Sequence, residues 1–209
     1  MHQLRTKISQ DLHDEVGATL TSISFLSEVA RKQTSDTDAP VVKTLDKIGE
    51  YSREMIGEIN DIVWAINPAN DKFDKITDRM KNFALPLLSA KNIRMEFKAD
   101  DELMNYSLGM EQRKNLYLVF KEAVNNAAKY AACSQIDVRF EKDKNMLILS
   151  ITDNGMGFNA AARRNGNGLK SMALRAKEIK AEFQIKSAPG EGTAVLLQMP
   201  ITKNADKVR

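Results

Sequence analysis

Residues 45–68 read LDKIGEYSREMIGEINDIVWAINP, and this segment determines how the whole chain is organised. Its apolar residues recur at alternating steps of three and four, which is the pattern of a heptad seam along one helix. The closing pair Asn67-Pro68 predicts the end of that helix, because a residue before proline is pushed out of the helical region. We therefore expect a domain boundary between residues 1–67 and 68–209. The seam contains Leu45, Ile48, Ser52, Met55, Ile59, Ile62 and Ile66, with Ser52 as its single polar member.

A second apolar stripe precedes this segment, from Leu4 to about Lys32, and predicts one continuous helix. The polar residues QTSDTDAP at 33–40 predict a helix stop and a chain reversal. Two helices joined by so short a loop form an antiparallel hairpin, and a single copy would leave apolar surface exposed. A dimeric four-helix bundle buries that surface, although later helices of the same chain could complete a bundle instead. The stripe contains Ile8, Leu12, Val16, Leu20, Ile23, Leu26 and Val29.

The remainder of the chain alternates helical and strand-like segments. Helices are expected at about 73–87, where Pro86 distorts the last turns, and at about 110–131 and 169–180. Strands are expected at 93–97, 136–140, 146–152, 183–186 and 193–199, with KDKN at 142–145 as a hairpin turn. This order predicts an α/β sandwich with helices on one face of a mostly antiparallel sheet, followed by a loose tail at 203–209. The fold class of the whole chain is therefore α+β, a helical hairpin followed by an α/β sandwich.

The composition restricts the class of protein only broadly. The 209 residues carry a formal net charge of +3, which gives no strong positive field, and we expect no direct nucleic-acid partner. The single cysteine, Cys133, cannot form an internal disulfide, which fits a reducing compartment and a cytoplasmic location. No apolar run approaches the roughly 20 residues needed to span a bilayer. We expect membrane attachment only through a sensor region outside this chain.

The segment DLHDEVG, residues 11–17, contains a candidate nucleophile in His13. The carboxylate of Asp14 can hold one ring nitrogen protonated and leave the other with a lone pair for attack on phosphorus. Gly17, one turn further along the helix, would leave room for a docked nucleotide. A half-exposed helical histidine beside solvated acidic residues would explain the same pattern, so the segment alone does not decide its function.

The segment FKEAVNNAAKYA, residues 120–131, places Glu122, Asn126 and Lys129 at helical offsets of four and three, on one face. An amide or carboxylate oxygen on that face can hold Mg²⁺, and a lysine can meet a phosphate. A solvated polar stripe is the alternative interpretation.

The segment ITDNGMGF, residues 151–158, ends a predicted strand with Asp153, Gly155 and Gly157. A buried carboxylate can accept a hydrogen bond from the exocyclic amine of adenine, and glycines let the backbone approach the ring closely. A tight turn would also explain these glycines.

Two further glycine-containing segments follow. In RRNGNGLKSM, Gly166 and Gly168 precede a helix that begins near Leu169, and free N–H groups at such a helix start attract phosphate. In PGEGT, the hydroxyl of Thr193 could complete the contacts to a base, although a hairpin turn is the simpler explanation of this segment taken alone. Neither the GxxxxGK[ST] loop nor the GxGxxG fingerprint is present in the sequence, so a nucleotide pocket here is of another kind.

In this order, DLHDEVG, KEAVNNAAKYA, DNGMGF, GNGL and GEGT resemble the histidine kinase core over nearly the whole chain. The resemblance is to the subfamily with a His-Asp phosphoacceptor motif, typified by nitrate and membrane-fluidity sensors. It implies a dimerising phosphotransfer hairpin and a GHKL-type ATP-binding domain of the Bergerat fold. The implied activity is autophosphorylation from ATP with Mg²⁺, followed by phosphotransfer to an aspartate on the receiver domain of a response regulator.

The resemblance also implies residue roles. His13 would be phosphorylated, with Asp14 as general base. Asn126 would be the Mg²⁺ ligand, Glu122 would support it, and Lys129 would contact phosphate.

For the nucleotide, the resemblance implies adenine binding by Asp153 with Thr193 lining the base pocket. The glycines of this part of the chain would shape the pocket: Gly155 and Gly157 would frame the base, and Gly166 and Gly168 would hinge a lid at about 158–167, before the helix start at Leu169.

Two residues depart from the family pattern. Ala18 stands where a glutamine thought to position water is frequent, which puts phosphatase activity in doubt. Tyr130 stands where histidine is frequent. Two other functions remain open from the sequence, an ATPase or protein-serine kinase of the same nucleotide-binding superfamily and a non-catalytic dimeric scaffold.

Overall fold

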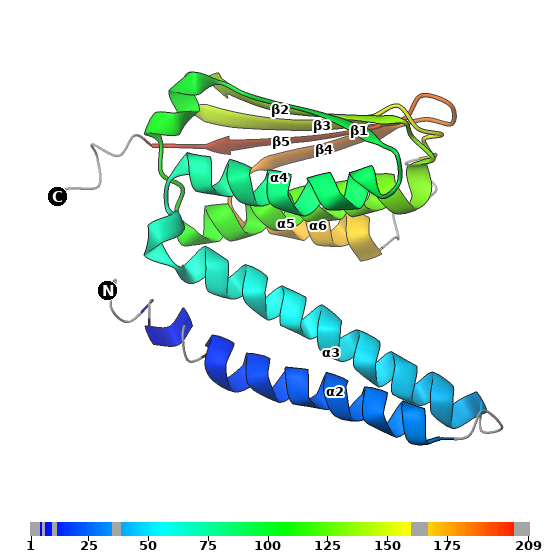
Figure 1. Ribbon diagram of the computed structural model, residues 1–209. Helices are drawn as coiled ribbons and strands as arrows, with labels where there is room; N and C mark the ends of the chain where they lie inside the picture. The colour runs from blue at the N-terminus through cyan, green and yellow to red at the C-terminus, as the bar shows by residue number, and fades with distance from the viewer. Residues whose placement is uncertain (1–4, 6, 10–11, 35–38, 160–166, 203–209) are drawn as a thin grey trace. The chain divides into compact units, whose positions relative to one another are not determined.

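The computed structural model describes residues 5, 7–9, 12–34, 39–159 and 167–202 (Figure 1). The chain divides into two compact units, Met1–Ala69 and Asn70–Arg209, so the division falls two residues after the position expected from the sequence. None of the described helices combines the length and apolar character needed to cross a bilayer.

The first unit is an antiparallel helical hairpin made of α2 (Ala18–Gln33) and α3 (Ala39–Ile66) (Figure 1). Helix α3 ends directly before Asn67-Pro68, as predicted, and Pro40 lies in its first turn, where a missing N–H costs nothing. The predicted hairpin is therefore confirmed.

The predicted single helix from Leu4 to Lys32 is wrong in one respect, because residues Leu12–Gly17 form a π-helical turn, η1, before α2 begins. Hydroxyl groups just beyond this turn bond back to its carbonyls. Thr19 Oγ1 donates to the Glu15 carbonyl and Thr21 Oγ1 to the Gly17 carbonyl, each over 2.8 Å. Such bonds compete with the regular α-helical ladder, and apolar periodicity does not reveal them.

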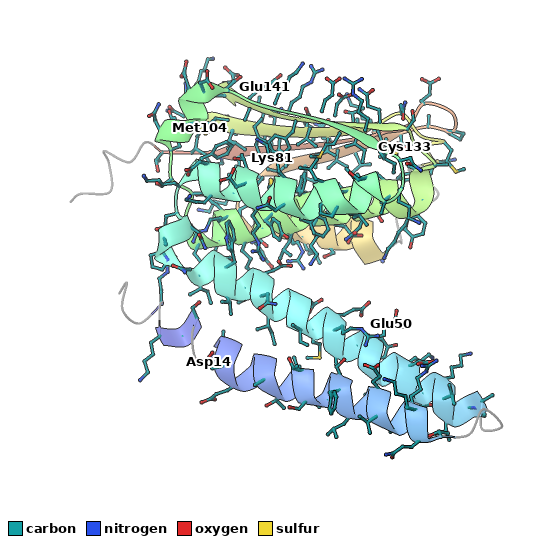
Figure 2. All side chains as sticks on the ribbon, in the orientation of Figure 1. Asp14, Glu50, Lys81, Met104, Cys133 and Glu141 are labelled. Atoms are coloured by element: carbon teal, nitrogen blue, oxygen red, sulfur yellow. The ribbon has the colours of Figure 1, made fainter. Side chains whose placement is uncertain are left out.

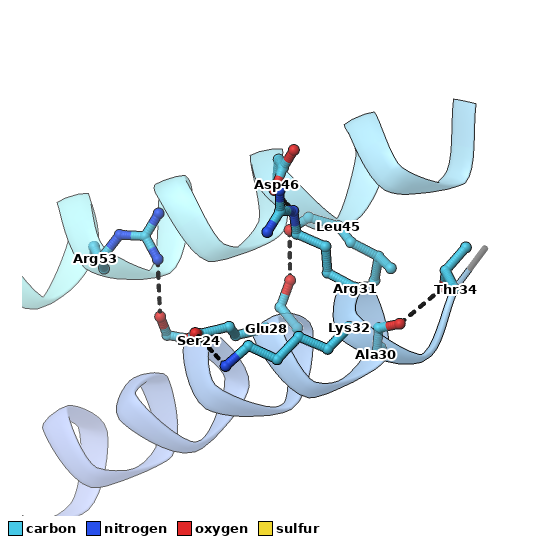
Figure 3. A network of polar contacts seen from close by, with 10 residues as sticks. Ser24, Glu28, Ala30, Arg31, Lys32, Thr34, Leu45, Asp46 and Arg53 are labelled. Atoms are coloured by element: carbon cyan, nitrogen blue, oxygen red, sulfur yellow. Dashed lines mark hydrogen bonds and ion pairs between the residues drawn. The ribbon is translucent and has the colours of Figure 1, made fainter. Parts of the chain in front are cut away.

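Polar and small side chains dominate the contact between the two helices. The Ser27 hydroxyl donates to the Leu45 carbonyl, and an added Cβ at Gly49 would lie 3.7 Å from that hydroxyl oxygen. An ion pair of 2.7 Å between Arg31 and Asp46 flanks this contact (Figure 3). The polar position of the seam is the buried one: Ser52 is 5% exposed, whereas Ile48, Met55 and Ile62 are 40%, 51% and 36% exposed.

The second unit is a five-stranded sheet in the order β1-β2-β3-β5-β4, with three helices on one face (Figure 1). Strands β1 and β2 are parallel and the other pairs are antiparallel, so the predicted α/β sandwich is confirmed. The strands are β1 (Arg94–Ala99), β2 (Gln135–Asp143), β3 (Met146–Asp153), β4 (Glu182–Ser187) and β5 (Thr193–Pro200). The helices are α4 (Phe73–Ser89), α5 (Met110–Asn126) and α6 (Asn167–Glu178), with short turns at η2 (Pro68–Asn70), η3 (Asp101–Asn105) and η4 (Ala127–Ala131).

The core of this unit lies between the sheet and its helices. Alternate residues of β2 and β3 are buried, and Phe73 of α4 packs edge-on against Phe140 of β2 at a ring distance of 5.3 Å. The other face of the sheet carries exposed side chains such as Glu141 (Figure 2). Helix α4 continues past Pro86 to Ser89, and the tail expected to be loose, residues 203–209, lies outside the described residues.

Candidate active site

A cavity of about 940 Å³ lies in the second unit between α5, α6 and the strands β3, β4 and β5. Its volume is in the range of pockets that hold small-molecule ligands. The structure brings together at this cavity seven of the residues singled out in the sequence, namely Glu122, Asn126, Asp153, Gly157, Gly168, Leu169 and Thr193.

Glu122 and Asn126 form a hydrogen-bonded pair on the α5 wall of the cavity. The Asn126 amide nitrogen donates to Glu122 Oε1 over 3.1 Å. This bond orients the amide, so that its oxygen is the atom of Asn126 suited to a cation. A hard divalent cation bound beside phosphates needs only one or two such protein oxygens. Among the described residues there is no cluster of three or more His, Cys, Asp or Glu side chains that could hold a metal ion without other ligands.

Asp153 ends β3 at the cavity and is 8% exposed. Burial raises the pKa of its carboxyl group, while hydrogen bonds from the Gly155 N–H and from the backbone and hydroxyl of Thr193 act in the opposite direction. The Gly155 bond is 2.9 Å long. A carboxylate held in this way is a strong acceptor for an amino group that enters the cavity.

The loop after β3 is held close to two other backbone segments. The Met156 N–H donates to the Ala131 carbonyl at the end of η4, and the Gly190 N–H donates to the Met156 carbonyl, each over 2.7 Å. A Cβ added at Gly155 would collide with the Ala131 carbonyl. Gly155 does not line the cavity, and its contribution is this close approach of backbone to backbone.

Gly157 has a φ of +59°, and a Cβ there would meet the Ala188 carbonyl. Side chains usually avoid this conformation, so a glycine is needed at this position.

The first turn of α6 lines the cavity with Gly168 and Leu169. N–H groups in the first turn of a helix have no partner within the helix and attract anions. A Cβ at Gly168 would collide with the Glu122 carboxylate, so the absence of a side chain lets α6 approach α5 closely. Gly166 and residues 160–166 of the predicted lid lie outside the described residues, whereas Phe158 and Asn159 line the cavity.

Ser187 was not singled out in the sequence, yet it connects three parts of the site. Its hydroxyl oxygen lies 3.1 Å from Thr193 Oγ1, donates to the Gly192 carbonyl over 2.8 Å and accepts from the Phe158 N–H over 2.9 Å. Serine at the end of a strand is common, so no pattern distinguished it.

Lys129 is exposed and lies outside the cavity lining, whereas its neighbour Tyr130 lines the cavity. The cause is the π-helical turn η4, which adds a residue per turn after α5 and shifts the face that Lys129 would share with Asn126 in a regular α-helix. The apolar lining was not predicted, although residues two apart on a strand share a face, which is a signal for Ile151 beside Asp153 and for Val195 beside Thr193. This lining includes Ile151, Met156, Met172, Ile185 and Val195.

His13 lies in η1 of the first unit, and its side chain is outside the described part of the structure. Its neighbour Asp14 is exposed. Among the described residues, and apart from its chain neighbours and the nearby backbone of its own helix, no heavy atom lies within 4 Å of a Cβ built on Gly17.

Comparison with protein families gives one match for each unit. Residues 5–71 match the model described as histidine kinase. Residues 111–203 match the model described as histidine kinase-, DNA gyrase B- and HSP90-like ATPase.

Similar curated proteins include the sensor protein VraS of Staphylococcus haemolyticus, 27% identical over 203 residues, which cover 97% of this chain and 57% of the relative. Another is the sensor histidine kinase LiaS of Bacillus subtilis, 25% identical over 198 residues, which cover 94% of this chain and 54% of the relative. The chain thus spans slightly more than half the length of these relatives.

Similar solved structures support the fold. The histidine kinase domain of the Erythrobacter litoralis EL346 blue-light activated histidine kinase gives a TM-score of 0.57 at 14% identity, covering 88% of this chain and 94% of that one. Full-length ShkA in complex with AMPPNP gives a TM-score of 0.60 at 13% identity, covering 97% of this chain and 46% of that one.

Replacing Gly168 by alanine tests the contact between α6 and the Glu122–Asn126 pair. The new methyl group must displace the Glu122 carboxylate and disturb its 3.1 Å bond to Asn126. We expect affinity for ATP with Mg²⁺ to fall about tenfold or more, the effect of losing one hydrogen bond to a charged group. The melting temperature should not fall, because alanine favours a helix by up to about 1 kcal/mol over glycine. Titration calorimetry and thermal unfolding measure both quantities.

Gly155→Ala is the matched control, because its methyl group would meet a backbone carbonyl rather than a movable side chain. It should lower the melting temperature clearly. Unchanged ATP affinity in Gly168→Ala would contradict this account of the pair.

Asp153→Asn tests the burial of the carboxylate through pH dependence. Because burial raises the folded-state pKa of Asp153, its protonated carboxyl group contributes to the stability of the folded protein at low pH. This contribution is lost as pH rises through that pKa. The amide keeps an acceptor oxygen and carries no charge. We expect the melting temperature of the variant, relative to wild type, to rise between about pH 4 and about pH 7, while ATP affinity falls at neutral pH.

Glu141→Gln removes an exposed carboxylate and serves as the control for loss of one charge. If the relative stability of Asp153→Asn stayed constant or fell across this pH interval, burial would not be the dominant influence on Asp153.

Proposed function

We propose, on the basis that this chain is a sensor histidine kinase core with a GHKL-type ATPase unit, that it transfers the γ-phosphate of ATP to His13 and then to an aspartate of a response regulator. The observation that carries the proposal is the cavity in the second unit, where an acidic acceptor, an amide–carboxylate pair and a helix start converge. An isolated ATPase unit would not account for the hairpin that precedes it and matches a histidine kinase model.

The adenine ring would occupy the part of the cavity beside Asp153. The buried carboxylate offers an acceptor for the exocyclic amine, and the Thr193 hydroxyl lies next to it. Apolar side chains such as Ile151 and Met172 line the same cavity and suit the faces of a base. The phosphates would lie toward Gly168 and Leu169, because N–H groups in the first turn of a helix have no partner within the helix and attract anions.

The donor set on α5 fits a magnesium ion bound together with ATP. Asn126 would supply its amide oxygen as the ligand, and Glu122 would hold that amide in place or hold a coordinated water. When bound, the ion neutralises negative charge on the phosphates. Lys129 would reach phosphate only from outside the lining, as a long flexible cation.

The first transfer would use the imidazole of His13. Asp14 would keep a proton on one ring nitrogen, so that the lone pair of the other, Nε2, attacks the γ-phosphorus. The N–P bond forms as the bond to the bridging oxygen breaks, and ADP leaves with that electron pair. In such reactions positioning and charge neutralisation supply most of the acceleration.

The second transfer would pass the phosphoryl group to a carboxylate oxygen of a response regulator, and the imidazole would recover its electron pair.

The His13-Asp14 pair supports the finer proposal of a subfamily shared with nitrate and membrane-fluidity sensors. Ala18 stands where a glutamine thought to position water is frequent, so we expect phosphatase activity to be weak.

We propose a homodimer formed through the hairpin. Four of the apolar residues left exposed on α3 recur every seven residues and so form one stripe along the helix: Val41, Ile48, Met55 and Ile62. On α2, Ile23 and Leu26 are exposed as well, at 40% and 63%. A second hairpin would cover both stripes in a four-helix bundle.

In the complete protein this core would be the cytoplasmic part of a receptor whose sensor region lies outside this chain.

Incubation with γ-labelled ATP and Mg²⁺ tests the proposed kinase activity. Wild type should acquire a label that is lost in acid and stable in base, as expected for phosphohistidine. His13→Gln should acquire none while still binding ATP. Asn126→Asp should also lose the label, because a second carboxylate beside Glu122 repels the phosphates.

A base-labile label that persists in His13→Gln would indicate a protein-serine kinase instead. ATP hydrolysis without any protein-bound label would indicate an ATPase.

The double variant Ile48→Glu, Met55→Glu tests the dimer. Two charges in the apolar stripe should convert the dimer to a monomer, which light scattering after size-exclusion chromatography measures directly. Phe25→Glu is the matched control: Phe25 is 64% exposed but lies two residues, about 200° around the helix, from Ile23. It should remain dimeric, and a dimer of unchanged stability in the double variant would contradict the proposed interface.

A further inference from the structure

We propose that Asp71 and Arg113 are positioning residues for phosphoryl transfer, because their ion pair ties the linker after the hairpin to the helix that carries the nucleotide site. The linker is residues 67–72, between α3 and α4. Arg113 Nη1 lies 2.7 Å from Asp71 Oδ1. The inference rests on the proposed kinase function and adds to it a rigid connection between the linker and α5 within the α/β unit.

The burial of this pair is its first unusual property. The Arg113 side chain is completely buried, and that of Asp71 is 32% exposed. Taking the Arg113 charge out of water is costly, and its attraction to Asp71 offsets this cost only when the geometry is good. A well-packed apolar pair would stabilise the unit at least as well. An ion pair differs from an apolar pair because its geometry is directional, so it holds the linker in one position relative to α5.

The backbone around the pair is fixed by the same residues. Arg113 Nη1 also donates to the Leu108 carbonyl over 2.8 Å, and the Leu108 N–H donates to the Asp71 carbonyl over 3.0 Å. The Arg113 guanidinium thus contacts both Leu108 and Asp71, the two residues that this backbone hydrogen bond joins. The linker therefore joins the α/β unit at a rigid point.

Helix α5 extends from this point to the cavity. Arg113 lies in its first turn, and at 1.5 Å per residue Glu122 and Asn126 lie about 13 Å and about 20 Å further along the same helix. Asn115 ties α5 to α6 by donating to Glu178 Oε2 over 3.0 Å. A displacement of the linker at Asp71 would be carried by α5 to the residues proposed to hold Mg²⁺ and phosphate.

The pair also spans the two segments recognised by the family models. The first model ends at residue 71 and the second begins at residue 111, so that residues 72–110 belong to neither. The ion pair therefore links the last residue of one matched segment to the first helical turn of the other, across the intervening α4 and β1.

Autophosphorylation kinetics of the full chain test the proposal with two variants. Asp71→Leu with Arg113→Met replaces the pair by apolar side chains, and Asp71→Asn removes the carboxylate charge alone. Glu102→Gln is the matched control, because it breaks an ion pair of 2.9 Å between the exposed Glu102 and Lys142 elsewhere in the unit. For each protein we would measure the melting temperature, the KM for ATP and the labelling rate of His13 at saturating ATP.

We expect the labelling rate at saturating ATP to fall roughly tenfold to a hundredfold in both variants, the scale of effect produced by a misplacement of about 1 Å. The KM for ATP should stay within about twofold of wild type, because the residues proposed to hold adenine, Asp153 and Thr193, lie on β3 and β5 and not on α5. Glu102→Gln should match wild type in both quantities. If the apolar variant does not fold, Asp71→Asn decides the question alone.

An unchanged labelling rate in a folded variant overturns the inference and leaves the kinase proposal intact. A rise in the KM for ATP with an unchanged labelling rate at saturating ATP also overturns it, since the pair would then only support the pocket. Absence of His13 labelling in wild type removes the kinase proposal and this inference together.

Discussion

Three backbone segments approach each other closely around Asp153, and the nucleotide site depends on that approach. Gly155 lies against the Ala131 carbonyl, and a Cβ at Gly192, where φ is +69°, would collide with the carbonyl of Asp153 itself. A side chain at either position would push the end of a helix or strand outward and open the floor of the cavity. The glycines of this region therefore serve the packing of backbone on backbone. The binding surface comes from their neighbours, above all from a carboxylate whose burial raises its pKa.

Much of the fold was predictable from the sequence because its elements have strong, simple periodicities. The seven-residue repeat of α3, the alternation in β2 and β3 and the stop at Asn67-Pro68 each correspond to an observed element. Seven of the residues singled out for a nucleotide site line one cavity. They were found because charged and amide side chains at helical spacing, and glycines at the ends of strands, mark where chain segments converge.

The remaining features depend on hydrogen bonding that composition does not reveal. The π-helical turns η1 and η4 arise where the ladder shifts by one residue, and η4 places Tyr130 rather than Lys129 at the cavity. The role of Ser187 depends on three partners from separate segments. In the hairpin, the heptad seam predicted an apolar contact between helices, but the buried position is the polar Ser52. Polar contacts join the two helices at Ser27 and at the Arg31–Asp46 ion pair, whereas Ile48, Met55 and Ile62 stay exposed.

The central claim is that the nucleotide held in the second unit phosphorylates the histidine of the first. The most direct measurement is peptide mass spectrometry of the full chain after incubation with ATP and Mg²⁺, with digestion at neutral to alkaline pH to preserve phosphohistidine. The account predicts a phosphoryl group on the peptide that contains His13, in amount matching the ADP formed in a single turnover. A phosphoryl group on serine or threonine, or ADP formed with no modified peptide, would contradict it.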